Sequence, residues 1–568
     1  MRPLLALNID YKVVKDPVHT SIELPSDFFR YIDDPLFQRL RQIKQTGLSH
    51  YVYPGLRHTR FEHSLGVAYL MFTSLEAIAR NTSRVYGENH EATRIVRKLV
   101  EEPEYLCSAG LAALFHDLGH LAWSHTFETG LTDYTVIEAA TSRVRGITVS
   151  VTRHEELTLK LSNILLEKHE GACGIDKEKL KANVSSILRL AYMSPKRVDE
   201  DELTLWVPAR LLSGTIDVDR GDYLIRDSRS AGVSYGLYDL DRLINVMVAA
   251  WEPFAQTLEG AKLDIGVIDK GISVVENMLI GRMYMYSEVY LHDIVLAYEA
   301  SAARLISLLL YTALQASLQG LKHVQGVERQ VLRCMASVLT GEAEDVELEY
   351  CMRVLTDPAF ETIIEMLATG TSTIYDELRS IEDGAWACPA LSIYSRVLSE
   401  RRHPSALYVS GRSADPIVAM LKPRNGSHLH PSNIRRYLKP YLEALSISPL
   451  PILIYSSPRV YDKDEPVYIV DRRTQIAYKL EDVHTSALGE LLRMGVTRSK
   501  IVLAYPLETY ASAQPILRSR RGKLLEDKHV LHSFLHCGYS AEDAKKILKS
   551  IGEKVRETAE ALSRLASP

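Results

Sequence analysis

The sequence has few of the features that mark disulfide-rich, strongly charged or membrane-spanning proteins. Its six cysteines are scattered over 568 residues, with no C-x-x-C pair. We therefore predict neither a disulfide framework nor a thiolate zinc site, and expect a reducing compartment. The 67 basic and 72 acidic residues give a net charge of −5, which excludes attachment to nucleic acid or membrane by bulk charge alone. Any polyanion must meet a local charge cluster.

Long hydrophobic runs are also missing. The N-terminal apolar run is shorter than the hydrophobic region of a signal peptide. The most apolar internal stretch, Leu305 to Leu321, is interrupted by polar side chains such as Ser307 and Gln315. The chain is nevertheless 46% apolar, enough for about two to four packed units. We expect a folded cytoplasmic protein without a membrane span.

The spacing of apolar residues divides the chain into three regions. Spacings of three and four, as at Phe37, Leu40 and Ile43, predict stacked amphipathic helices up to about residue 321. The same period continues over residues 322–448, whereas residues 449–568 contain short β-rich runs and a charged helical tail. We predict a mainly α protein with a helical domain over 1–321, a helical region over 322–448, and a small α/β unit over 449–568 for regulation or oligomerisation. The predicted strands are Ile452 to Tyr455, Val467 to Val470, Gln475 to Leu480 and Ile501 to Tyr505.

Three segments of the first region concentrate histidine, aspartate and arginine. His63 lies in the first segment, and His116 and Asp117 follow an apolar helical run in the second. A buried ionised aspartate costs several kcal/mol unless a cation neutralises it. The third segment, residues 214–227, is rich in aspartate, and we select Asp219 as a further ligand. Two imidazoles and two carboxylates suit Mn, Fe, Co, Ni or Zn with open coordination positions, which is typical of a hydrolytic site.

These residues form the H…HD…D pattern of HD-domain metal-dependent phosphohydrolases. The strings DDPLFQRLRQIKQTG, RFEHSLGV, HDLGHLAWSH, IDVDRGDYLIRDS and GVSYG resemble the deoxynucleoside triphosphate (dNTP) triphosphohydrolase branch of that family, over about Tyr11 to His292. The resemblance implies an α-helical HD bundle around the metal. It also implies cleavage of a dNTP at the α-phosphorus, giving a deoxynucleoside and inorganic triphosphate.

The resemblance assigns substrate contacts residue by residue. Arg60 matches an arginine beside the α-phosphate, and Asp227 and Gln45 match contacts to the sugar 3′-hydroxyl. Tyr290 matches the aromatic residue that leaves no room for a 2′-hydroxyl. The residues that match contacts to the outer phosphates, with Mg²⁺ as a further ion, are Arg220, Tyr223 and Arg282. Because Arg282 and Tyr290 are eight positions apart, we expect one helix to hold both on nearly the same face.

Hydrolysis also needs an acid for the leaving 5′-oxygen. The candidates are His120, His125 and His154, and Glu128 occupies a position where the family usually has aspartate. The animal relatives bind a guanine nucleotide at a subunit interface. The resemblance therefore implies an activator, GTP or a dNTP, and assembly as a homo-oligomer, either a dimer or a tetramer. The matching activator positions are Lys12, Val13, Asp33, Gln38 and Arg41.

Other interpretations stay open on the sequence. The protein is alternatively another HD phosphohydrolase, acting on a phosphodiester or a nucleoside monophosphate, or a non-catalytic sensor of nucleotide or nucleic acid. Taken singly, His120 and His125 are also compatible with core histidines, and Tyr290 with simple packing. The basic cluster Arg518, Arg520, Arg521 and Lys523 is more typical of a solvated face than of a phosphate or nucleic-acid contact.

Overall fold

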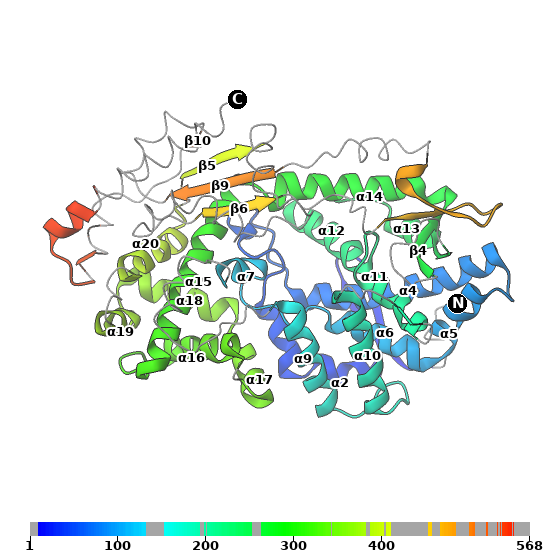
Figure 1. Ribbon diagram of the computed structural model, residues 1–568, viewed down its shortest axis with the longest axis horizontal. Coiled ribbons are helices and arrows are strands. Elements are labelled where there is room, and N and C mark those ends of the chain that lie inside the picture. Colours follow the sequence, from blue (N-terminus) through cyan, green and yellow to red (C-terminus); the bar gives the residue numbers. More distant parts are fainter. Residues whose placement is uncertain are drawn as a thin grey trace.

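The computed structural model is mainly helical, as predicted, with two groups of helices side by side (Figure 1). It describes residues 9–131, 153–193, 198–199, 202–252, 263–341, 343–381 and 387–402. Beyond these it describes shorter stretches, namely 405–410, 452–456, 466–483, 499–505, 519–520, 531, 534–535, 537–547 and 549. Of the basic cluster predicted near residue 520, Arg520 lies in a strand and Arg518, Arg521 and Lys523 lie outside the described residues.

The first group of helices is built around the long helix α4 (Arg60–Tyr86), which packs against α5, α6 and α12. A capping box starts α4, because the Thr59 side chain accepts from the backbone at its N-terminus and Glu62 accepts from Thr59 N. The other helices of this group are η1 (Ser26–Phe28), α2 (Phe29–Ile32), α3 (Pro35–Gln38), η2 (Arg39–Gln42), η3 (Ser49–Tyr51), α5 (Glu91–Glu101), α6 (Pro103–Phe115), α7 (His125–Leu131), α9 (His154–Lys168), α10 (Lys177–Tyr192), α11 (Leu203–Leu212), α12 (Val218–Ala231), α13 (Leu240–Val246), η5 (Asp269–Gly271), α14 (Ile272–Tyr284) and the π-helical η6 (Met285–Tyr290).

The second group of helices surrounds α15 (Asp293–Gln319), which packs against α7, α16 and α20. By length and composition α15 could cross a membrane, but 89% of its apolar window is buried inside the fold, which is typical of a core helix. The other members are α16 (Gly326–Thr340), α17 (Asp345–Val354), α18 (Asp357–Thr369), α19 (Ile374–Ser380) and α20 (Ala387–Ser399). Gly370 ends α18 in the left-handed conformation that glycine adopts without strain.

The four strands predicted after residue 449 are present, but they belong to two different sheets. β6 (Ile452–Ser456) and β9 (Ser499–Tyr505) lie in the order β10-β5-β9-β6, with β5 (Ser405–Ser410) and β10 (Ser519–Arg520). β7 (Tyr468–Val470) and β8 (Ala477–Lys479) continue the sheet of β3 (Met247–Trp251) and β4 (Leu263–Ile268), through a parallel β4–β7 pair. The late strands therefore extend a sheet that begins in the first group. β1 (Tyr11–Asp16) and β2 (Thr20–Pro25) form a separate hairpin.

The prediction that the cysteines form no disulfide framework is wrong. All six are paired in the structure, as Cys107–Cys173, Cys334–Cys351 and Cys388–Cys537. Two of the bridges join residues 66 and 149 positions apart in the sequence. Only the packing of distant segments brings such cysteines together, so their spacing carried no signal.

Loss of a disulfide is expected to destabilise the protein. We expect the double substitution Cys107→Ser and Cys173→Ser to lower the free energy of unfolding by about 2–4 kcal/mol, because the unfolded chain regains the entropy of an open loop. Urea unfolding of the wild type and of the double variant, both without reductant, measures this difference, and thiol titration of the denatured wild type reports whether the cysteines are paired. Reactive thiols in the unreduced, denatured wild type would contradict the pairing.

Candidate active site

The start of α4 supplies two side chains of the site. Arg60 and His63 are three positions apart in the first turns of the helix, so they lie on one face. The Arg60 guanidinium is buried, donates from Nε to Ser124 Oγ (2.9 Å), and forms an ion pair with Asp117 through Nη1. The capping box that fixes the N-terminus of α4 therefore also fixes the position of Arg60 next to the second segment.

The second segment begins where α6 ends. His116 is the C-cap residue of α6, and the chain then turns sharply, with Leu118 N donating to Phe115 O (3.0 Å). Because His116 and Asp117 leave the helix in this turn, both side chains reach the same point. Both residues are buried, at 4% exposure each. Burial opposes the charged form of Asp117, but Arg60, His116 and His120 outweigh it and hold the pKa of its carboxyl well below the ordinary value.

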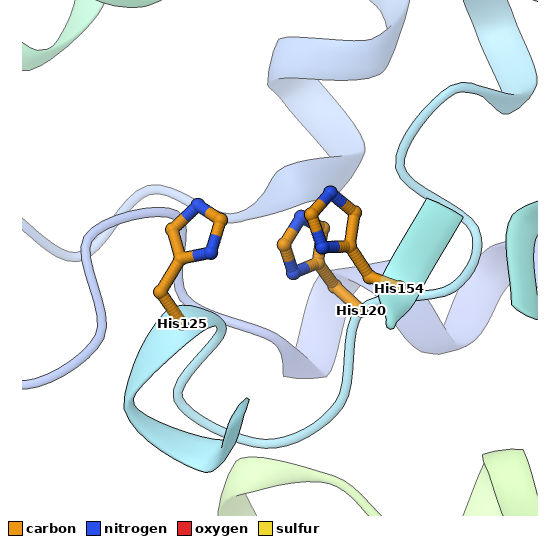
Figure 2. Close-up of side chains that lie close together, drawn as sticks. All are labelled: His120, His125 and His154. Atoms are coloured by element: carbon orange, nitrogen blue, oxygen red, sulfur yellow. The ribbon is translucent and has the colours of Figure 1, made fainter. Parts of the chain in front are cut away.

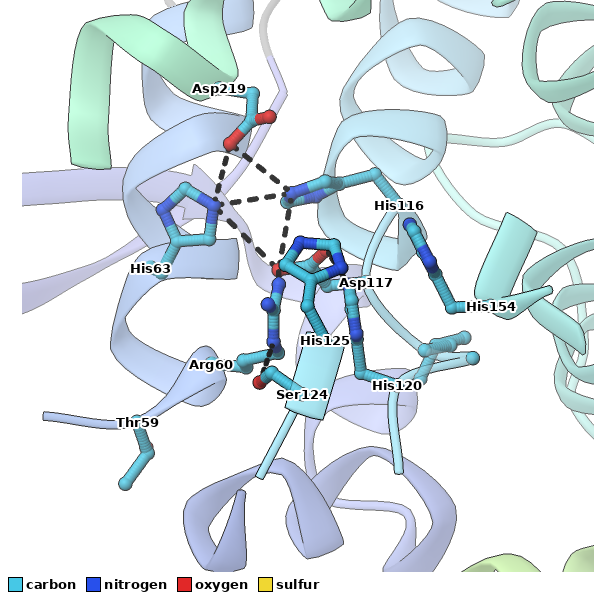
Figure 3. A network of polar contacts seen from close by, with 12 residues as sticks. Thr59, Arg60, His63, His116, Asp117, His120, Ser124, His125, His154 and Asp219 are labelled. Carbon is cyan, nitrogen blue, oxygen red and sulfur yellow. Dashed lines mark hydrogen bonds and ion pairs between the residues drawn. The ribbon is translucent and has the colours of Figure 1, made fainter. Parts of the chain in front are cut away.

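The four predicted metal ligands converge (Figure 3). His63 Nε2 lies 3.0 Å from Asp219 Oδ1, 3.2 Å from His116 Nε2 and 3.7 Å from Asp117 Oδ2. His116 Nε2 lies 3.4 Å from Asp117 Oδ2 and 3.9 Å from Asp219 Oδ1. The four donors come from α4, the turn after α6, and the first turn of α12. The structure thus brings together side chains that are distant in the sequence.

The hydrogen bonds of the His63 and His116 imidazoles indicate which kind of ion the four side chains could bind. His63 donates from Nδ1 to Asp222 Oδ2 (2.8 Å), and His116 donates from Nδ1 to Ala113 O (2.8 Å). Each ring thereby directs Nε2 at the other ring and at two carboxylates. Two facing lone pairs among carboxylates repel one another unless a cation lies between them. Histidine, histidine, aspartate and aspartate with satisfied outer nitrogens fit a divalent transition metal.

The pKa of His63 reflects the same surrounding carboxylates. Burial lowers the pKa of its imidazole, but hydrogen bonds with Asp219 and Asp222 outweigh the burial and raise the pKa to about 10. The centre of the site therefore favours positive charge, whether a proton or a metal ion.

Asp222 is a site residue that the sequence analysis did not select. It is fully buried and, besides His63, accepts from His19 Nε2 (2.7 Å) and from Arg226 Nε (2.7 Å). Arg226 also donates from Nη1 to Asp16 Oδ2 (2.8 Å), so the turn of the β1–β2 hairpin reaches the same carboxylate. The spacing of Asp219 and Asp222, three positions apart on α12, was the available signal.

We expect Asp222→Asn to weaken metal binding by roughly 10–100-fold, the usual cost of losing an outer carboxylate that orients a ligand histidine. Competition between the protein and a chelator for Mn²⁺ measures this affinity. The exposed Asp241→Asn is the matched control and should bind the metal as the wild type does. Equal affinities for the two variants would contradict an orienting role for Asp222.

Beside the metal-ligand group, His120, His125 and His154 lie close together (Figure 2), and Glu128 joins them in a second polar group. Glu128 accepts from His154 Nδ1 (2.6 Å) with one oxygen and from His125 Nδ1 (2.9 Å) with the other. The longer side chain thus reaches both rings. His120 stacks on His154, with ring centroids 3.9 Å apart and planes 18° apart. Nearly parallel imidazoles cannot both direct lone pairs at one ion, so the geometry favours proton transfer over a second metal site.

The surroundings shift the pKa values of His154 and His120 in opposite directions. Burial lowers the pKa of His154, but Glu128 and Glu155 outweigh it and raise the pKa above the ordinary value. Burial, Arg60 and His154 together hold the pKa of His120 well below that value. At neutral pH His154 therefore retains a proton more readily than His120.

Two of the three predicted sugar contacts, Asp227 and Tyr290, lie together. Asp227, on α12, accepts from Tyr290 Oη (2.6 Å) and from His58 Nε2 (2.7 Å). The Tyr223 ring lies between the two sites, 6.4 Å from the Tyr290 ring and 6.5 Å from the His63 ring. The Gln45 side-chain oxygen is buried and has no hydrogen-bond partner among the described residues.

The predicted phosphate contacts have protein partners in the structure. Arg220 forms an ion pair with Asp217, the N-cap residue of α12, while its side chain stays 20% exposed. Arg282 lies with its guanidinium 5.7 Å from the Tyr286 ring. The sequence predicts that one helix holds Arg282 and Tyr290. Arg282 lies in α14, and Tyr290 ends the π-helical η6, which follows α14 without a break, so the helical turn widens between the two residues.

The predicted activator positions lie on the hairpin and on the segment from α2 to η2. Lys12 Nζ lies 4.7 Å from the centre of the Phe29 ring, and Val13 beside it is 54% exposed. Gln38 accepts from Arg41 Nε (2.8 Å), and the Arg41 guanidinium stacks 3.5 Å above the Phe61 ring. Asp33 follows directly after α2. An activator function for these residues stays a prediction.

The fold is mainly helical and the residues of the HD pattern converge in it, and comparisons with known proteins agree with this. No protein-family model matches the chain. It is 31% identical to the human deoxynucleoside triphosphate triphosphohydrolase SAMHD1 over 51% of its length, and 30% identical to the uncharacterized protein MJ1154 of Methanocaldococcus jannaschii over 50%. These matches cover 44% and 47% of the two relatives, so the chain spans less than half the length of each. The uncharacterized protein YwfO of Bacillus subtilis is 26% identical over 73% of this chain and 86% of its own.

Among solved structures, a phosphohydrolase from Bacteroides thetaiotaomicron covers 87% of this chain and 99% of its own, with a TM-score of 0.56 and 23% identity. This likeness shows the fold. Together with the sequence relatives, it confirms the predicted resemblance to HD-domain dNTP triphosphohydrolases.

Proposed function

We propose that this protein is a metal-dependent phosphohydrolase that cleaves dNTPs to deoxynucleosides and inorganic triphosphate. The observation that carries the proposal is the convergence of His63, His116, Asp117 and Asp219 with both outer Nδ1 atoms already satisfied. A divalent Mn, Fe, Co, Ni or Zn ion held by these residues would supply Lewis-acid polarisation of a phosphoryl oxygen.

Arg60 is the side chain best placed to meet the α-phosphate. It is anchored on both edges, by Asp117 and by Ser124 Oγ, so its guanidinium is held beside the metal ligands without rotamer freedom. A preorganised cation there stabilises the negative charge that grows on the phosphoryl oxygens as water attacks. Arg220, Tyr223 and Arg282 extend the same positive and hydroxyl-bearing surface toward the outer phosphates, where Mg²⁺ would also bind.

The reaction replaces the bond from the α-phosphorus to the 5′-oxygen with a bond to a water oxygen, so the leaving 5′-oxygen must gain a proton. His154 is suited to this role because Glu128 raises the pKa of its imidazole and so favours the protonated form, and Glu128 also orients the exposed His125. His120 stays neutral and stacks on His154, which supports the ring without adding a competing charge.

The choice of a deoxyribose substrate rests on three polar side chains. Asp227 offers a buried carboxylate, Tyr290 is held against it, and the Gln45 oxygen needs a donor. A sugar 3′-hydroxyl can donate to either acceptor, while the Tyr290 ring occupies space that a 2′-hydroxyl would need. Activation by a guanine nucleotide and homo-oligomer assembly are further parts of this proposal, and they rest on the resemblance alone. A cytoplasmic location is also part of it and rests on the apolar pattern of the sequence, because the three disulfides remove the support that we drew from the cysteines.

The experiment is product analysis with Mn²⁺ and each dNTP, with and without GTP. The proposal expects equal amounts of deoxynucleoside and inorganic tripolyphosphate. Release of pyrophosphate and dNMP would falsify the assigned reaction and favour a different phosphohydrolase. Ribonucleotides serve as the matched substrate control and should react far more slowly.

A further inference from the structure

The second helical group sends one buried carboxylate into the first group. Asp357 is the first residue of α18, and it is 1% exposed. Its Oδ1 accepts from Trp123 N (2.8 Å), and its Oδ2 accepts from Lys44 N (3.1 Å) and Lys44 Nζ (3.3 Å). A single side chain thus fastens two backbone segments of the first group that are far apart in the sequence.

Both fastened segments carry residues of the candidate active site. Ser124, which follows Trp123, accepts from Arg60 Nε (2.9 Å) and donates to Lys44 O (2.9 Å). Gln45, the predicted sugar contact, follows Lys44 directly. The path from Asp357 to the guanidinium of Arg60 therefore runs through one backbone hydrogen bond and one serine hydroxyl.

The backbone at this point needs such support. Trp123 and Ser124 have φ angles of 55° and 54°, in the left-handed region that residues with side chains rarely adopt. Two consecutive residues in this region persist only where their surroundings over-determine them. The Phe360 ring of α18 packs against Trp123, with ring centroids 5.4 Å apart, so α18 supports the turn by packing as well as by hydrogen bonding.

We propose that Asp357 is a positioning residue of the active site. Through Trp123 and Ser124 it holds the Arg60 guanidinium in place for the α-phosphate, so the second helical group completes a site whose other residues lie in the first. Asp357 touches no reacting atom and is not itself catalytic. The role for Arg60 in turnover rests on the proposed function.

The test compares Asp357→Asn with Glu361→Gln. The amide of asparagine can accept from one segment but cannot accept from both, so Arg60 loses its fixed position. We expect kcat for tripolyphosphate release to fall by roughly 10–100-fold with KM changed only a few-fold, the scale expected from a displacement of about 1 Å. Glu361 is the exposed carboxylate that shares Lys44 with Asp357 (2.8 Å to Nζ), and its loss should leave kcat unchanged.

A double-mutant cycle separates positioning from general stability. If Asp357 acts through Ser124, then Asp357→Asn added to Ser124→Ala lowers kcat little further, because the link is already broken. Full additivity, or a loss in the Glu361→Gln control equal to that in Asp357→Asn, overturns the proposal. Should Asp357→Asn fail to fold, Asp357→Glu keeps the charge but displaces the oxygens by one methylene, and the same cycle applies.

A readout without nucleotide keeps this test distinct from that of the proposed function. Arg60 pairs with Asp117, a predicted metal ligand, so the visible absorption of the Co²⁺-loaded protein reports the position of the pair. We expect the Asp357→Asn and Ser124→Ala spectra to shift alike, and the Glu361→Gln spectrum to match the wild type. An unchanged spectrum in Asp357→Asn refutes the link even if no dNTP is cleaved. If the Asp357→Asn spectrum shifts as expected but the wild type does not cleave dNTPs, only the proposed reaction is refuted.

Discussion

Asp117→Asn is expected to abolish both metal binding and turnover. The substitution keeps the shape of the side chain but removes the charge that faces His116 and Arg60. Loss of a metal ligand should lower the metal affinity by more than the roughly 100-fold that follows from loss of a residue hydrogen-bonded to a ligand. Metal content after gel filtration and tripolyphosphate release measure the two effects.

The control for this prediction is Asp241→Asn, at an exposed position of α13. It should keep wild-type metal content and activity. Calorimetric binding of a dNTP separates enzyme from sensor, because a non-catalytic sensor would keep its nucleotide response in Asp117→Asn. Unchanged turnover in Asp117→Asn would remove the basis for assigning the metal site to catalysis.

Glu128→Gln is expected to lower kcat by about 100-fold, the scale of a misplaced general acid, and to shift its pH dependence. Burial lowers the pKa of His154, and Glu128 is the largest influence that raises it. Without the Glu128 charge the pKa of His154 falls, so the proton is lost at a lower pH. The alkaline limb of the kcat profile should therefore move to lower pH.

The matched control is Glu155→Gln. Glu155 Oε2 lies 3.5 Å from His154 Nδ1, farther than the 2.6 Å of Glu128, and it is a weaker influence on the pKa. Its loss should move the alkaline limb less and leave kcat near the wild-type value. A pH profile that is identical in Glu128→Gln and the wild type would show that His154 is not the acid.

Asp357 and Asp222 have related roles at the site. Asp222 orients His63 from within α12, and its own partners reach the β1–β2 hairpin. Asp357 supports Arg60 from α18. The ligands and the phosphate-facing arginine are thus each held by a buried carboxylate, which is how a site keeps its geometry before substrate arrives.

The sequence by itself determined the helical class and the identity of the converging ligands. Apolar periodicity predicts helices because a helix repeats its buried face locally, and the order of His63, His116, Asp117 and Asp219 carries the HD pattern. The four late strands were also visible, because alternation and turn residues are local signals.

Only the tertiary structure decided the disulfide pairs, the sheet shared by β4 and β7, and the supporting roles of Asp222 and Asp357. Each of these depends on contacts between residues far apart in the chain, and spacing in the sequence carries no measure of that distance. The π-helical turn before Tyr290 is local, but it leaves the apolar pattern of a helix in place, so periodicity could not distinguish it from a continuing α-helix.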